Sequence, residues 1–295
     1  DWVRVIDDDG GPGFACDVAL VLAPFRLGDQ DIEALFRRVD NHGGPRRPQV
    51  VAVHMEDPQA VTANGRLLGR ADWVVSNDYA AFRHYRAKLD EAGLTERAKR
   101  VMCWNALGAS PRFLRAAQGA KRDVDVLVLG YAYPSRQAIV KAFAKDAPSA
   151  WKVACVGDGW ADAMKGFKVE CVPTADEEAT AGWCSRARAI LVTHRRQQDI
   201  GGFPLFEPES IHRGFLESAA GAVVLVDDVR TFGAGGIEFV RYSDGRDAAK
   251  KAFALLKDAP RMAELAEKNG ALARGELSMA SRVRAILNAI RDERY

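Results

Sequence analysis

The feature that most constrains the fold is an alternation, along the whole chain, between short apolar runs and segments with helical spacing. This alternation predicts parallel sheets, because successive parallel strands must be joined by crossover helices. Strands are expected within residues 16–25, 48–55, 71–77 and 99–108, and then within 124–134, 151–159, 168–173, 187–195, 222–226 and 236–244.

Helical patterns lie between these runs. They cover residues 31–43, about 79–92, 135–145 and about 175–186, and a helical tail at 245–291 has start or stop signals at Asp258-Ala259-Pro260 and Asn269-Gly270. The stretch 110–123 is polar, basic and irregular, so we place the domain boundary there. A chain of 295 residues suits two domains, 1–115 and 116–295, each with the alternation of a Rossmann-like α/β fold.

The stretch from residue 206 to 228 predicts a helix followed by a buried strand. Pro208 and Glu209 suit a helix N-terminus, and Gly221 suits its C-terminal cap before the apolar run 222–226. Glu217 lies eight positions after Glu209, about two turns on, so both carboxylates can border one cleft. Two such groups can accept hydrogen bonds from the vicinal hydroxyls of a sugar ring. The alternative is a helix-terminal Glu beside an unrelated surface Glu.

The carboxyl edge of the second predicted sheet offers an anion site. Gly130 and Tyr131 follow a strand, and Arg136 lies at the start of the next helix, where an anion is favoured. Arg195 and Arg196 follow another strand and reach the same edge. These side chains could neutralise a diphosphate. A plain surface role is the alternative for each arginine.

In the first half, His54 and Asp57 end a strand and are the candidates there for a general base or a sugar-hydroxyl partner. A structural role for the histidine is the alternative. Asn77 and Asp78 end the next strand and could cap the helix that follows. The sequence has no Ser-His-Asp order and no zinc spacing among its five histidines, which argues against hydrolase and metalloenzyme classes.

Composition agrees with a soluble globular protein. Apolar residues make up 48% and charged residues 28%, and the net charge of +2 creates no strong field toward nucleic acid or membrane. Five cysteines without a CxxC pair predict a reducing, cytoplasmic location. No apolar run approaches the 18 or so residues of a membrane span.

The Glu-x7-Glu spacing, with Arg213 and the segment ESAAGAVVLVDD, resembles the donor-binding segment of GT-B glycosyltransferases of group 1, and in particular the CgeB-like (spore-maturation-type) family. The chain has one more residue between Arg213 and Glu217 than that family's pattern. The segments VVAVHMEDPQA, ADWVVSNDYAAFRHYR, KRVMCWNALGASPRFL and VDVLVLGYAYPSRQAIVKAF are similar to that family in the same order, so the resemblance extends over about residues 15–290.

The resemblance implies two Rossmann-like domains with an active site in the cleft between them. It implies transfer of a sugar from a nucleotide-diphosphate sugar, such as a UDP-sugar, without a bound metal or other cofactor. Glu217 would contact the ribose hydroxyls and Glu209 the sugar or its phosphate neighbourhood. The spacing leans toward retention of anomeric configuration, whereas inversion would require Asp57 or His54 as base.

Several alternatives stay open. The acceptor could be a glycan, a protein, a small molecule or, as in some viral enzymes, a modified base in DNA, with Arg46-Arg47, Lys99-Arg100 and Lys121-Arg122 as its footprint. A nucleotide-sugar 2-epimerase or a non-catalytic nucleotide-sugar-binding module would use the same fold. The first half is short for a GT-B acceptor domain, because no opening strand–loop–helix unit is evident in residues 1–14. Either this domain is reduced or a segment precedes the chain.

Overall fold

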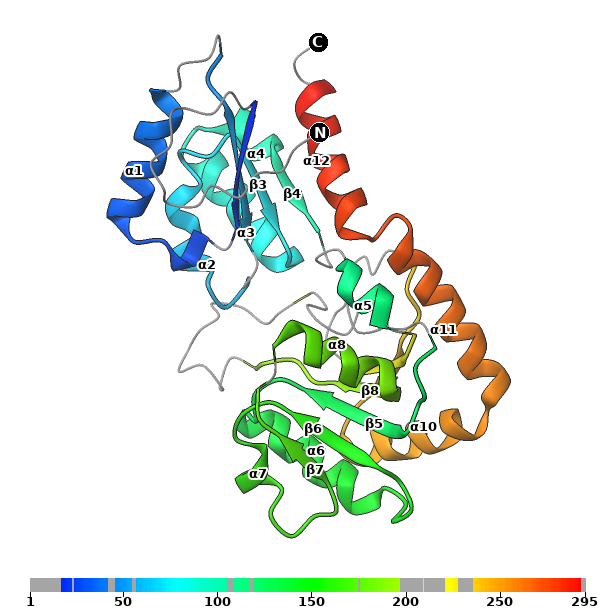
Figure 1. Ribbon diagram of the computed structural model, residues 1–295. Helices are drawn as coiled ribbons and strands as arrows, with labels where there is room; N and C mark the ends of the chain where they lie inside the picture. The colour runs from blue at the N-terminus through cyan, green and yellow to red at the C-terminus, as the bar shows by residue number, and fades with distance from the viewer. Residues whose placement is uncertain are drawn as a thin grey trace.

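A computed structural model shows the protein as two α/β units, each built on a parallel sheet (Figure 1). The described residues are 17–22, 24–41, 46–54, 57–104, 109–116, 119–174, 176–196, 209, 221–227 and 236–292. Within them, no helix has the length and apolar character needed to cross a bilayer.

The second sheet has six described strands, and their order reverses once within the sheet. Its strands are β5 (Val124–Leu129), β6 (Val153–Val156), β7 (Glu170–Val172), β8 (Ala187–Val192), β9 (Val223–Asp227) and β10 (Val240–Tyr242). They lie in the order β10-β9-β8-β5-β6-β7, and every neighbouring pair is parallel. The chain builds outward from β5 to β7, then returns to the other side of β5 to form β8. Between β5 and β8 lies the topological switch point, where open α/β sheets bind ligands.

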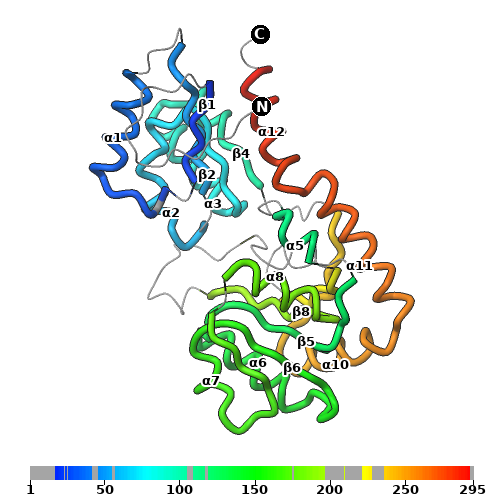
Figure 2. The backbone as a smooth tube through the Cα atoms, in the orientation of Figure 1, coloured from blue at the N-terminus to red at the C-terminus, as the bar shows by residue number. Residues whose placement is uncertain are grey.

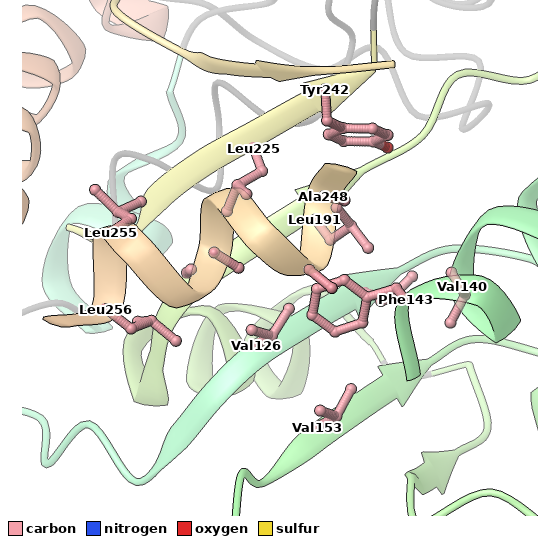
Figure 3. Packing of buried hydrophobic residues seen from close by; sticks show 14 of the residues in the cluster. Val126, Val140, Phe143, Val153, Leu191, Leu225, Tyr242, Ala248, Leu255 and Leu256 are labelled. Carbon is pink, nitrogen blue, oxygen red and sulfur yellow. The ribbon is translucent and has the colours of Figure 1, made fainter. Parts of the chain in front are cut away.

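Helices cover both faces of this sheet, as the buried apolar residues on both sides of its central strands require. One face packs against α6 (Pro134–Asp146), α7 (Trp160–Ala163), α10 (Gly245–Lys257) and α11 (Ala259–Arg274). Figure 3 shows Phe143 of α6 and Leu255 of α10 in this cluster. The other packs against α5 (Pro111–Ala116) and α8 (Glu177–Arg186). Gly245 allows α10 to approach α6 closely, because a Cβ there would lie 2.2 Å from the carbonyl oxygen of Ile139.

The first sheet has four described strands in sequence order, all parallel: β1 (Val18–Leu22), β2 (Gln49–His54), β3 (Trp73–Ser76) and β4 (Val101–Cys103). One face packs against a cluster supplied by α1 (Asp29–Asp40), α2 (Val61–Asn64), α3 (Tyr79–Glu91) and α4 (Thr95–Lys99). Two 3-10 turns, η1 (Pro24–Arg26) and η2 (Gly65–Leu67), complete the connections.

The last helix, α12 (Met279–Asp292), returns to the first sheet (Figures 1 and 2). Ile286 and Ile290 pack into a cluster with residues of β2 and β3 and with Trp104. The C-terminal segment therefore covers the face that the first-half helices leave open. The domain boundary at residues 115 and 116 stays a prediction. Helix α12 comes after this boundary in sequence, but it packs on the sheet that comes before it.

Two local expectations were wrong. The stretch 110–123 is not wholly irregular, because it contains α5, and Phe113 on that helix is buried in the core of the second sheet. Asn269-Gly270 does not interrupt the tail, because α11 continues to Arg274. Asn269 is fully buried, and its amide group bonds both the N–H and the carbonyl of Glu238, at 3.0 and 2.8 Å, so it has a tertiary role inside the helix. The helix expected before Gly221 lies outside the described residues.

Candidate active site

A closely packed glycine turn follows β5 at the switch point. Gly130 has a φ of 94°, and its carbonyl accepts a hydrogen bond of 2.7 Å from the indole N–H of Trp160. The turn after β6 packs directly on it, because a Cβ on Gly157 would lie 2.3 Å from the Gly130 carbonyl oxygen. The absence of a side chain at Gly157 therefore allows the two turns to pack against each other. Tyr131 follows Gly130 and leaves 48% of its surface exposed at the edge of the sheet.

Arg136 joins the ends of the two strands that flank the switch point. Its Nε and Nη2 donate to the hydroxyl and the carbonyl of Thr193, just after β8, at 2.7 and 2.9 Å. Its Nη1 donates to the carbonyl of Tyr131, just after β5, at 2.8 Å. The helix-start arginine thus fixes the spacing of the edge and places a positive charge there.

The predicted arginine pair after β8 divides between two partners. The Arg195 guanidinium lies 4.7 Å from the centroid of the Tyr133 ring, and Arg136 lies 5.6 Å from the same ring. Arg196 instead donates to the carboxylate of Asp227, at the end of β9, at 3.1 Å. Three guanidinium groups are therefore gathered at the carboxyl ends of β5 and β8.

The structure adds a buried acid–histidine pair at this edge. The His194 Nδ1 contacts one carboxylate oxygen of Asp227, and the His194 backbone N–H donates to the other at 3.0 Å. Burial raises the pKa of the Asp227 carboxyl, but His194 and Arg196 outweigh it and hold that pKa below its usual range. No motif in the sequence pairs these two residues. The available signal was that each residue ends or follows a neighbouring parallel strand.

In the first half, Asp57 is the centre of a buried hydrogen-bond network. Its carboxylate accepts from Ser76 at 2.7 Å, from the Tyr85 hydroxyl at 2.7 Å and from the Asn64 amide at 2.9 Å. The residue is 0% exposed. Burial raises the pKa of the Asp57 carboxyl, but the contacts with His54, Ser76 and Tyr85 outweigh it and hold the pKa below its usual range. The carboxylate is thus kept ionised among donors, away from solvent.

His54 is equally buried. Its Nδ1 lies 3.6 Å from an Asp57 carboxylate oxygen, and its ring meets the Tyr85 ring edge-on at 4.9 Å between centroids. Within the described part of the chain, neither ring nitrogen of His54 has a hydrogen-bond partner. The structure thus brings the two predicted catalytic residues together, beneath the surface of the first sheet's carboxyl edge.

The predicted cap at the start of α3 is confirmed for Asp78, whose carboxylate accepts from the Ala81 N–H at 3.0 Å. Its second oxygen accepts from the backbone N–H of Glu209 at 2.8 Å. The Glu209 side chain in turn pairs with Arg83 of α3 at 2.9 Å. Burial raises the pKa of Asp78 to about 6. Glu209 therefore contacts α3 of the first unit, a contact that its position in the sequence does not predict.

Glu217 and Arg213, the other two residues of the predicted donor-binding segment, lie outside the described residues. Across the part of the chain that is described, no three metal-binding side chains are grouped together.

The two parallel sheets, each packed against helices, define an α/β protein with Rossmann-like units and with arginines at the switch point of the second sheet. Residues 112–288, more than half of the chain, match the family described as glycosyl transferase-like. The chain belongs to this family and is a glycosyltransferase. The narrower CgeB-like resemblance stays a prediction.

Solved structures agree on the fold. HepE from Anabaena in complex with UDP-glucose matches with a TM-score of 0.54 and 14% identity over 83% of this chain and 73% of that chain. TarM matches with a TM-score of 0.57 and 12% identity over 86% of this chain and 52% of that chain. An alpha-glucosyltransferase in complex with UDP-glucose and DNA containing an abasic site matches with a TM-score of 0.60 and 10% identity over 94% and 80%. The expected GT-B class is confirmed. Among curated proteins, none matches in sequence.

Proposed function

We propose that this glycosyltransferase takes its sugar from a UDP-sugar bound at the carboxyl edge of the second sheet. The observation that carries the proposal is the group of Arg136, Arg195 and Arg196 around the turn at Gly130, at the switch point between β5 and β8. Ligands of open α/β sheets bind at such points. Support comes also from HepE, which is described in complex with UDP-glucose.

The arginines would stabilise the diphosphate leaving group. As the bond between the sugar carbon and the phosphate oxygen breaks, negative charge builds on the diphosphate, and fixed cations are most effective where that charge develops. Arg136 is held by three hydrogen bonds, so it needs little reorganisation during the reaction. Arg195 stacks on Tyr133 and adds a second charge beside the same ring. Exposed Tyr131 borders this edge and offers an aromatic surface to the nucleotide.

On the sugar side, we retain Glu209 as the carboxylate that accepts a hydrogen bond from a sugar hydroxyl. We retain Glu217 as the carboxylate that accepts hydrogen bonds from the ribose hydroxyls. We assign Asp57 and His54 a positioning role in place of general-base catalysis, because both side chains are 0% exposed. Their network instead holds the ends of β2 and β3, from which the acceptor side of the enzyme is built.

Donor binding provides the main test. UDP and UDP-glucose, followed by GDP- and TDP-glucose, are titrated by calorimetry and thermal shift into the wild type and into the double variant Arg195→Ala/Arg196→Ala. A ligand at 100 times its Kd should add about 2.7 kcal/mol of stability to the wild type. The double variant should bind UDP at least about tenfold more weakly, a loss of about 1.4 kcal/mol.

The matched control is Arg261→Ala, since Arg261 lies on α11 and pairs with Glu238 and Glu264. Its UDP affinity should equal that of the wild type. Failure of every nucleotide sugar to bind the wild type would overturn the proposal. Full UDP affinity in the double variant would move the donor site elsewhere.

We further propose that transfer needs no metal ion, because arginines can supply the charge that a metal would otherwise supply. Activity should persist in excess EDTA. A complete loss with chelator, restored by Mg²⁺ or Mn²⁺, would contradict this.

Acceptor identity requires its own assay. Of the basic pairs considered as a DNA footprint, Arg47 contacts Asp40 and Asp72, and Lys99 contacts Glu96. These ion pairs do not favour a nucleic-acid acceptor, so we give glycans and small hydroxyl compounds precedence. The set of acceptors to be tested still includes DNA with a hydroxyl-bearing modified base. Product formed from the donor alone would instead indicate an epimerase, and tight binding without turnover would indicate a binding module.

A further inference from the structure

Glu209 is the residue of the proposed donor site that the structure ties to the other half of the protein. Its carboxylate Oε2 accepts from the Arg83 Nη2 at 2.9 Å, and only 15% of its side chain is exposed. Its backbone N–H donates to the Asp78 carboxylate at 2.8 Å. Both partners lie at the start of α3, more than 120 residues away in sequence.

The two partners are themselves fixed. Asp78 is 0% exposed and caps α3 through the Ala81 N–H, so its second oxygen is held in place for Glu209. The Arg83 guanidinium lies 5.2 Å from the centroid of the Tyr79 ring, one turn earlier on the same helix. An arginine restrained by an aromatic ring loses less side-chain entropy when it binds a carboxylate. The groups at the start of α3 that contact Glu209 are thus held in place by contacts within α3 itself.

We propose that Arg83 and Asp78 are positioning residues for the sugar end of the donor, acting across the two halves of the chain by orienting Glu209. This inference rests on the proposed donor site. It assigns first-half residues to donor recognition, whereas the sequence alone predicted the diphosphate site at the carboxyl edge of the second sheet.

The physical basis is orientation. A carboxylate that receives hydrogen bonds from sugar hydroxyls must present its lone pairs at a fixed angle, and one oxygen anchored by a guanidinium leaves the orientation of the other defined. The hydrogen bond from the Glu209 backbone N–H to the Asp78 carboxylate fixes the position of the Glu209 main chain. The effect should therefore depend on the sugar and should be absent for the bare nucleotide.

Binding of UDP and of UDP-glucose is measured by calorimetry in the wild type, Arg83→Ala, Arg83→Lys and Arg86→Ala. Arg86 is the matched control, because it is also exposed on α3 and lies 5.5 Å from the ring centroid of Phe82. Arg83→Ala should weaken UDP-glucose about fivefold, or roughly 1 kcal/mol, with unchanged UDP affinity. Arg83→Lys should recover part of the loss, and Arg86→Ala should equal the wild type.

A second arm repeats the measurement in a Glu209→Ala background, where Arg83→Ala should have no further effect. Persistence of the full fivefold loss in that background would show that Arg83 does not act through Glu209. Equal loss for UDP and UDP-glucose would indicate a general structural role and overturn the proposal, as would no loss for either.

Failure of this inference can be told apart from failure of the donor site. If the wild type binds no UDP-sugar, the proposed function fails, and the inference that rests on it fails with it. If the wild type binds UDP-glucose and Arg195→Ala/Arg196→Ala weakens it, while Arg83→Ala does not, the donor site stands and only the role of Arg83 is rejected.

Discussion

Removal of the Asp57 carboxylate should destabilise the first half of the protein. The loss of unfolding free energy can be worked out from the hydrogen-bond network around this carboxylate. Three side-chain donors, on Ser76, Tyr85 and Asn64, point at a carboxylate that is 0% exposed. In Asp57→Ala each donor loses a charged partner and water does not replace it, at about 1–3 kcal/mol for each unsatisfied group. These losses are less than additive because the surrounding structure relaxes. We therefore expect the unfolding free energy to fall by about 4 kcal/mol, which lies within the range of about 3–5 kcal/mol for removing one partner of a buried ion pair.

Asp57→Asn should cost less, about 1–2 kcal/mol. The amide oxygen can still accept from Tyr85 and Asn64, which share one carboxylate oxygen. The amide NH₂ then faces the Ser76 hydroxyl, which can accept from it while donating to the Asp78 carbonyl, 3.0 Å away. The ratio between the two variants therefore tests the geometry of the network as well as its strength.

Urea unfolding, followed by tryptophan fluorescence and circular dichroism, provides the measurement. Asp29→Ala is the control, because that side chain is 88% exposed and pairs with Arg66, so the change should stay within about 0.5 kcal/mol. An unfolding free energy for Asp57→Ala within about 0.5 kcal/mol of the wild type would refute the reasoning. A folded Asp57→Asn enzyme that binds donor normally, yet transfers sugar more than about tenfold more slowly, would restore the catalytic role.

Three further predictions concern the glycine turn and two carboxylates. Gly157→Ala should lower the unfolding free energy by more than about 2 kcal/mol, because the new Cβ would lie 2.3 Å from the Gly130 carbonyl oxygen. The control is Gly182→Ala, because Gly182 lies inside α8 and a Cβ there would have no atom within 4 Å; in the same urea unfolding measurement this change should be neutral or slightly stabilising. The Asp78 carboxyl should titrate near pH 6 in a ¹³C NMR titration, since burial raises its pKa from 3.8 to about 6. The folded state then holds a proton that the unfolded state has lost, so the stability falls by on the order of 3 kcal/mol as the pH rises through this window, and Asp78→Asn should remove that slope. The pKa of Asp227 is shifted in the opposite direction, so its contribution is present above the ordinary carboxyl pKa and lost as the pH falls through the lowered one. Asp227→Asn should therefore be less stable at pH 7 and lose less stability on acidification, and urea midpoints that fall in parallel with the wild type would contradict this.

The alternation of apolar runs was enough to determine the two parallel sheets. Unbroken apolar runs such as 126–129 and 222–226 identified buried strands, because parallel strands covered on both faces contain few polar residues. The cap at Asp78 was also readable, since a helix N-terminus is satisfied by a side chain next to it in sequence. That Arg136, Arg195 and Arg196 lie at one edge could also be predicted, because the carboxyl ends of parallel strands meet at one edge of a sheet.

Tertiary structure alone decided what those edge residues contact. Nothing in the sequence around His194 names Asp227 as its partner, because that pairing depends on β8 and β9 being neighbours. The burial of Asp57 depends on Tyr85 and Asn64 reaching it from two separate helices. Periodicity reports spacing along the chain, whereas solvent exposure, ion pairing and pKa depend on which distant side chains lie within a few ångströms. For that reason the candidate residues could be proposed from sequence, and their division between a half-buried arginine edge and a fully buried carboxylate network could not.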